Sequence, residues 1–130
     1  MTEPVIVVAA ALIVDAAGRM LLVRKRGTDR FMQAGGKPEP GETPRGTLLR
    51  ELAEELGFVP DPASIEPLGR FDAAAANEAG HLVRADVFRI RADLDAVPAA
   101  EIAEARWCSR ADALALGDRL APLARALLDL

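Results

Sequence analysis

The chain has 130 residues, of which 51% are hydrophobic and 28% are charged. This length and balance are typical of a soluble globular protein, so we expect one domain over residues 1–130. The net charge of −4 argues against non-specific nucleic-acid binding, whose affinity comes from a basic surface.

The start of the chain predicts no targeting or membrane segment. Glu3 stands where a secretory signal would carry positive charge. The apolar run Val5–Val14 is too short to span a bilayer, which takes about 20 helical residues. We therefore expect a cytoplasmic protein with no membrane partner.

Val5–Val14 is rich in β-branched residues and predicts a strand buried on both faces. A turn at Asp15–Gly18 and a second strand at Met20–Arg24 predict a hairpin. Phe31–Gln33 is expected to be a short strand that leads into a loop at Gly35–Gly36.

Basic residues cluster at the end of the second strand, where Arg24, Lys25 and Arg26 follow one another. They form either a solvated strand end or a contact to substrate phosphate, for which a guanidinium group is well suited. Arg24, Arg26 and the later Lys37 are our candidates for substrate binding.

A helix is predicted to follow the glycine-rich stretch. Thr43 is a good N-cap, Pro44 suits the first helical position, and Gly57 suits a left-handed end. Leucines at 48, 49, 52 and 56 give this helix an apolar face toward the core.

Glu51, Glu54 and Glu55 share another face of this helix, because residues three and four apart are neighbours. Like charges at this spacing are destabilising. A divalent cation would remove the repulsion, and ligands that offer only oxygen favour hard ions such as Mg²⁺, Mn²⁺ or Ca²⁺.

The second half of the chain predicts further strands and a helical end. Ile65 to about Ala76 and His81–Ile90 are expected to pair across a turn, with a bulge or cover on both faces near Phe88. A short strand around Trp107 follows, and next to it the single cysteine, Cys108, is expected to be a small buried hydrophobe. Ser109–Asp112 resembles a helix start, and apolar residues from Leu120 to Leu128 predict a closing amphipathic helix.

Gly36–Phe58 resembles the Nudix box, which reads Gly, five residues, Glu, seven residues, Arg-Glu, an aliphatic, any residue, Glu-Glu, any residue, Gly, and an aliphatic or aromatic. The matching residues are Gly36, Glu42, Arg50, Glu51, Leu52, Glu54, Glu55, Gly57 and Phe58. If each fixed residue occurs at ~7%, seven of them coincide by chance on the order of once in 10⁸ windows. The loop before the box departs from the family's usual Leu-Pro-Gly-Gly, because Ala34 replaces the proline.

The resemblance to the Nudix hydrolase family implies an α/β fold, an α/β/α sandwich around a mixed β-sheet. It also implies hydrolysis of a diphosphate linkage in a nucleoside diphosphate derivative, with Mg²⁺ as cofactor and Mn²⁺ as the alternative. The implied partner is a nucleotide-like small molecule. The identity of the substrate and the number of metal ions stay open. The oligomeric state is also open, and a homodimer is one possibility.

By the same resemblance, the metal ligands are Glu51, Glu54, Glu55, the Gly35 carbonyl and a glutamate from a later loop. Glu101 is preferred over Glu104 for that last position by its spacing before the final strand. Glu51 is the first candidate for the general base and Glu54 the second. Arg50 is expected to pair with a carboxylate and so hold a ligand in place, since groups that orient metal ligands matter nearly as much as the ligands. Glu42 is expected to be either the partner of Arg50 or a further ligand through water.

Two other functions are compatible with this resemblance. A catalytically silent Nudix-like binding or regulatory module would be expected to lack some of the box glutamates, and all are present. A prenyl-diphosphate isomerase would need a reactive cysteine and more histidines than the single His81, which we expect to be a surface residue.

Overall fold

A mixed sheet organises the computed structural model, which describes residues 3–130, and seven strands of that range belong to it. The main path is β3-β2-β1-β6-β5, while β4 pairs with β1 and β7 pairs with β2. The strands are β1 (Val5–Val14), β2 (Met20–Lys25), β3 (Phe31–Met32), β4 (Ala34–Gly36), β5 (Ile65–Ala74), β6 (Leu82–Arg91) and β7 (Ile102–Cys108). The helices are α1 (Pro44–Leu56), α2 (Arg110–Ala115) and α3 (Pro122–Ala126).

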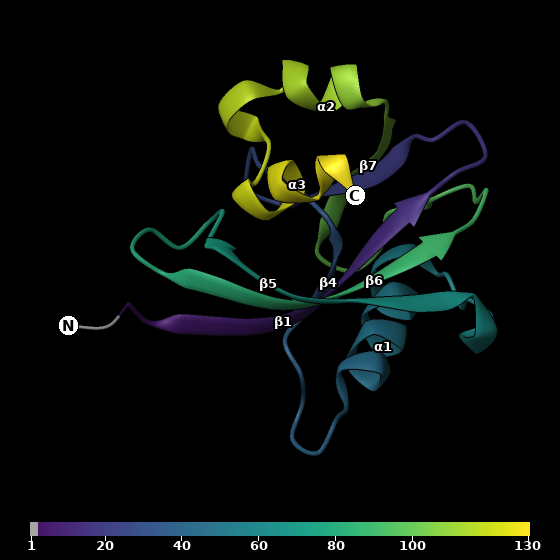
Figure 1. Cartoon of the computed structure of the whole chain (residues 1–130), viewed down its shortest axis with the longest axis horizontal. Coiled ribbons are helices and arrows are strands. Elements are labelled where there is room, and N and C mark those ends of the chain that lie inside the picture. Colours follow the sequence, from purple (N-terminus) through teal and green to yellow (C-terminus); the bar gives the residue numbers. More distant parts are fainter. Residues whose placement is uncertain (1–2) are drawn as a thin grey trace.

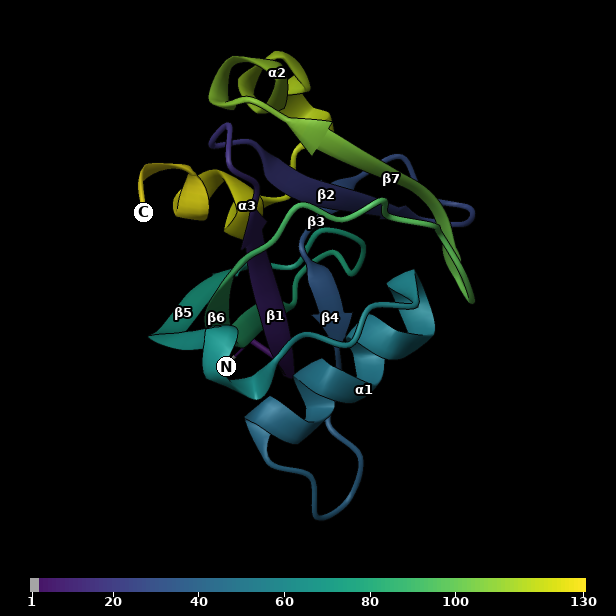
Figure 2. The same ribbon diagram turned by 90° about the vertical axis from the view of Figure 1, so that its right-hand side faces the viewer.

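Helices cover both sides of the sheet, with α1 on one side and α2 and α3 on the other (Figures 1 and 2). The leucines of α1 pack into one apolar cluster with the odd-numbered residues of β1. Residues of α2 and α3 pack into a second cluster with the even-numbered residues of the same strand. This confirms the α/β/α sandwich around a mixed sheet.

The β1–β2 hairpin closes only at the pair Val14 and Met20. Beyond that pair β2 runs antiparallel to β7, and β1 runs parallel to β6 along its whole length. The two strands of the hairpin therefore diverge, and Figure 2 shows β2 crossing above β1 and β4. The divergence opens the sheet where the glycine-rich stretch enters it.

The prediction that β1 is buried on both faces is wrong for its first half. Val5 and Val7 each keep 45% of their surface exposed. The apolar cluster on the α1 side begins only at Ala9, so the residues before it extend past the helix.

Gly35–Gly36 was expected to be a loop, and that prediction is also wrong. Ala34–Gly36 is a short strand, β4, whose register places Gly35 opposite Ala10 of β1. A side chain at Gly35 would overlap the carbonyl oxygen of Ala9. The glycine is therefore needed for close approach to a neighbouring strand, and Gln33 is left between β3 and β4.

The helix α1 begins and ends where the sequence predicts. The Gly46 N–H donates to the Thr43 hydroxyl oxygen at 3.1 Å. Gly57 is left-handed at φ 61° and its N–H donates to the Ala53 carbonyl. The N-cap at Thr43 and the left-handed end at Gly57 therefore fix where α1 begins and ends.

The end of the chain differs from the single closing helix that was predicted. Ser109 forms the expected capping box with Asp112, and α2 follows it. The closing helix α3 begins only at Pro122 and tightens into a 3₁₀ turn at Leu127–Asp129, because proline suits a first helical position and interrupts what precedes it. Of the helices in residues 3–130, none is long and apolar enough to cross a membrane.

Two smaller expectations, for Cys108 and for a bulge near Phe88, are confirmed. Cys108 is buried at 1% exposure. The register of β5 shifts between Pro67 and Gly69, opposite Phe88 and Val87 of β6. Phe88 belongs to one apolar cluster and Val87 to the other, so this part of β6 is covered on both faces. Phe31 is fully buried, with the guanidinium of Arg106 lying 4.7 Å from its ring centre.

Candidate active site

A cavity of about 510 Å³ opens where β1 and β2 diverge. One part of its wall carries charged groups from α1, the end of β2 and the loop before β7, together with the backbone of β4. The other part is largely apolar and comes from β1, β6 and the start of α3. The cavity therefore joins the α1 side of the sheet to the α3 side.

Glu55 is the most deeply buried of the box glutamates, at 2% exposure. Its Oε1 accepts a hydrogen bond from the Gly35 N–H at 2.9 Å. Burial raises the pKa of Glu55 to about 7, and the charges of Glu51 and Glu101 act in the same direction. The hydrogen bond from the Gly35 N–H and the charge of Lys25 lower the pKa of Glu55, but they do not offset the cost of burial.

Glu51 lies one helical turn before Glu55 and lines the same cavity. Burial raises the pKa of Glu51, while Arg50 opposes the rise by donating to Glu51 Oε1 at 2.9 Å. A side chain at Gly36 would lie 2.5 Å from the Glu51 carboxyl carbon. The absent side chain of Gly36 leaves the room that this carboxylate occupies.

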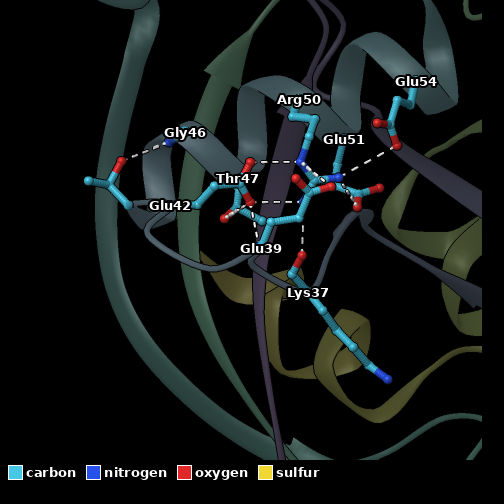
Figure 3. Close-up of polar contacts among 9 residues, drawn as sticks. Lys37, Glu39, Glu42, Gly46, Thr47, Arg50, Glu51 and Glu54 are labelled. Carbon is cyan, nitrogen blue, oxygen red and sulfur yellow. Dashed lines mark hydrogen bonds and ion pairs between the residues drawn. The ribbon is translucent and has the colours of Figure 1, made fainter.

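Arg50 is the centre of a polar network at the start of the site (Figure 3). Its guanidinium donates to both oxygens of Glu42, at 2.7 and 2.9 Å, and to the Lys37 carbonyl at 3.0 Å. This pairing lowers the pKa of Glu42 to about 2. Arg50 and Glu42 are thus hydrogen-bonding partners. The bonds from Arg50 to Glu42 and to the Lys37 carbonyl connect the loop between β4 and α1 to the helix.

Glu54 is not among the residues that line the cavity; 52% of its side chain is exposed, and one of its oxygens lies 3.6 Å from Arg50 (Figure 3). The two candidates from the later loop are placed differently. Glu101 lines the cavity and its charge acts on both Glu51 and Glu55. Glu104 instead pairs with Arg24 at 3.2 Å and with Arg106 at 2.8 Å, so the geometry favours Glu101.

Arg24 and Arg26, which were expected to bind substrate, are not among the residues that line the cavity. Arg24 pairs with Glu104, and Arg26 donates weakly to the Ala100 carbonyl at 3.4 Å. Lys25, the last residue of β2, does line the cavity. The sequence places Lys25 in the basic cluster, but simple strand alternation does not single it out, because the register of β2 shifts between Arg24 and Lys25.

Lys37, the third of these candidates, does line the cavity. With Lys25 it places two ammonium groups on the wall that also carries the acidic side chains. His81 is not among the lining residues and lies at the start of β6, with its Nδ1 3.2 Å from the Ala79 carbonyl.

Within residues 3–130, no three His, Cys, Asp or Glu side chains are gathered as a group that could hold a metal ion. The salt bridges explain this, because Arg50 holds Glu51 and lies near Glu54. The chemistry of the lining residues nevertheless fits a hard cation. Glu51, Glu55 and Glu101 are three of the five glutamates that line the cavity, and Glu51 and Glu55 have pKa values raised by burial and mutual repulsion.

Comparison with known proteins adds an independent finding. A family model described as the NUDIX domain matches residues 4–129. The solution structure of the E. coli ORF135 protein is 30% identical, covering 98% of this chain and 88% of that one, with a TM-score of 0.67. The crystal structure of the MutT protein from Methanosarcina mazei Go1 is 26% identical, covering 88% of this chain and 84% of that one, with a TM-score of 0.69.

A curated relative, the 8-oxo-dGTP diphosphatase of Haemophilus influenzae, is 40% identical over 63 residues. That match covers 45% of this chain and 46% of the relative, so it spans about half of either protein.

Proposed function

This chain belongs to the NUDIX domain family, and on that premise we propose that it is a divalent-cation-dependent pyrophosphohydrolase of nucleoside di- or triphosphate derivatives. The observation that supports this most is the cavity that Glu51, Glu55 and Glu101 share with two lysines and the glycines of β4. The proposed reaction adds water across a P–O–P linkage, so that one phosphoanhydride bond breaks and two phosphate-bearing products and a proton are released.

The proposed cation is Mg²⁺, with Mn²⁺ as the alternative. Glu51, Glu54, Glu55, Glu101 and the Gly35 carbonyl are the residues that would hold it. When bound, such an ion neutralises phosphate oxygens and lowers the pKa of a coordinated water. Because Glu54 lies outside the cavity wall, its participation requires a rotation of its exposed side chain.

Lys25 and Lys37 are suited to bind the phosphate oxygens, since each offers an ammonium group to the cavity. Glu51 is suited to accept the proton of the attacking water, because its carboxylate lines the cavity and burial raises its pKa toward that of a useful base. Glu54 is the second candidate for this proton transfer.

Arg50 has a positioning part in this proposal. It holds Glu42 through two hydrogen bonds and Glu51 through one. A bidentate pair fixes the guanidinium, and the fixed guanidinium limits the rotamers of Glu51. A cation in the cavity would compete with Arg50 for that same carboxylate.

The substrate class follows from the family and from the partial likeness to an 8-oxo-dGTP diphosphatase. A test is to incubate the protein with ordinary and 8-oxo nucleoside triphosphates and with ADP-ribose, with Mg²⁺ or with a chelator. Products are identified by ion-exchange chromatography and ³¹P NMR. We expect a nucleoside monophosphate and a second phosphate product only when the cation is present.

The Glu54→Gln variant tests the role of the acidic helix face in this assay. Turnover should fall by at least about 10²-fold, because a cation ligand and a candidate base are lost. Glu66→Gln is the matched control, since Glu66 is an exposed residue of β5 outside the cavity. Nucleotide binding without cleavage by the unaltered protein would contradict the proposal and indicate a binding module.

A further inference from the structure

Gln33 carries the one buried side-chain polar atom in residues 3–130 that has no hydrogen-bond partner. The residue sits between β3 and β4, is 6% exposed and lines the cavity. Its Oε1 is unpartnered, and its Nε2 contacts only the Met20 sulfur at 3.9 Å. A thioether is a weak acceptor, so neither end of this amide has a strong partner among the described residues.

A buried amide without a partner is unusual, because the large majority of buried polar atoms in folded proteins form a hydrogen bond. Leaving an acceptor unpaired destabilises the folded chain. An apolar residue of the same size would avoid that cost. The position is therefore explained better by a ligand than by the stability of the fold.

The surroundings of Gln33 describe the ligand further. The cavity wall on the α3 side of the sheet is mostly apolar and includes Ile6, Val8, Met32, Val83, Ala121 and Leu123, while Asn77 and Glu78 of the β5–β6 turn also line the cavity. Most of these residues belong to or pack against the apolar cluster that contains α3. Glu51, Glu55, Glu101 and the two lysines lie at the other end, toward α1 and β4.

A ligand that fits both ends has phosphates at one end and a flat, largely apolar group at the other. An amide offers one acceptor and one donor side by side, and the edge of a nucleobase offers the complementary pair. The aliphatic wall excludes water from this contact, which strengthens the hydrogen bonds made there.

We propose that Gln33 is a specificity-determining residue that reads the hydrogen-bonding edge of the substrate's base in the apolar part of the cavity. The inference rests on the proposed function, since it assumes that phosphates occupy the charged part. The free carbonyl oxygen selects a base with an N–H donor at that edge. A site built to pair a polar group discriminates strongly against a ligand that leaves the group unpaired.

The test compares Gln33→Met with the unaltered protein, using nucleoside triphosphates and a deoxyribose 5-triphosphate that lacks a base. We expect the preference for the favoured nucleotide over the base-free compound, as a ratio of kcat/KM, to fall by about tenfold or more, mostly through KM. Met20→Leu is the matched control, because it removes the sulfur contact and keeps the amide. In Met20→Leu the ratio should change by less than about twofold.

Thermal unfolding separates this role from a structural one. Replacing an unpaired buried amide by an apolar group of similar size should leave Tm unchanged or raise it. A lower Tm together with an unchanged kcat/KM ratio would overturn the inference and show that Gln33 serves the fold.

A binding measurement keeps the inference independent of hydrolysis. The side-chain ¹⁵N amide signals of Gln33, assigned by their loss in Gln33→Met, are followed as nucleoside monophosphates are added. If they shift while no substrate is cleaved, the proposed function fails and the inference stands. If cleavage occurs and neither these signals nor the kcat/KM ratio responds, the inference fails alone.

Discussion

Replacing Glu55 by glutamine should stabilise the cation-free protein at alkaline pH, although it removes a proposed ligand. Glu55 is 2% exposed, and burial raises its pKa from 4.5 to about 7. Because the folded state binds this proton more tightly than the unfolded state, stability falls as the pH rises from about 4.5 to about 7. Each unit of pKa corresponds to about 1.4 kcal/mol, so ionised Glu55 costs the folded protein roughly 3 kcal/mol above pH 7.

Glutamine removes this cost and keeps the local hydrogen bond. Its amide oxygen can accept from the Gly35 N–H, as Glu55 Oε1 does at 2.9 Å. We expect Glu55→Gln to exceed the unaltered protein in free energy of unfolding by up to roughly 3 kcal/mol at pH 8, and the difference to vanish near pH 4.

The assay is urea unfolding followed by circular dichroism across this pH range, with a chelator present. Glu54→Gln is the matched control, because Glu54 carries the same charge on the same helix but has 52% of its side chain exposed. That control should change stability by less than about 0.5 kcal/mol. A Glu55→Gln variant that is less stable at pH 8, or equally stabilised at every pH, would refute the reasoning.

Three further predictions follow from the same geometry. Gly36→Ala places a methyl group against the Glu51 carboxylate. Because the flexible Glu51 side chain can move aside, thermal unfolding should show little change in stability. Steady-state kinetics should show turnover falling by at least about tenfold, because the displaced carboxylate is no longer in position. Arg50→Met breaks the hydrogen bonds to Glu42 and Glu51 and should lower both Tm and kcat; an unchanged kcat would show that Arg50 does not position the site. His81→Ala should leave turnover within about twofold, since His81 does not line the cavity; a large loss in the same kinetic assay would show that a functional residue was overlooked.

The local features of the chain were predictable from the sequence because their causes are local. The ends of α1 follow from Thr43 and Gly57, which satisfy backbone groups within one turn of themselves. The capping box at Ser109 is of the same kind. The grouping of acidic residues on α1 also follows from spacing alone.

The remaining features depend on contacts between distant segments. β1 pairs in parallel with β6 over ten residues, with Val5 opposite Leu82. Nothing within either strand's own sequence specifies this register. Gly35 was expected in a loop because its short strand exists only through pairing with β1. The burial of Glu55 beneath β4, and the unpaired amide of Gln33, likewise appear only once these strands are in place.

Diffraction from a crystal soaked in Mn²⁺ and recorded at the manganese absorption edge tests the central claim most directly. We predict an anomalous peak beside Glu51 and Glu55, with the Glu51 carboxylate turned from Arg50 toward the ion. A crystal that shows no peak at this position, with Arg50 still hydrogen-bonded to Glu51, would contradict the proposal that the acidic face of α1 holds a catalytic cation.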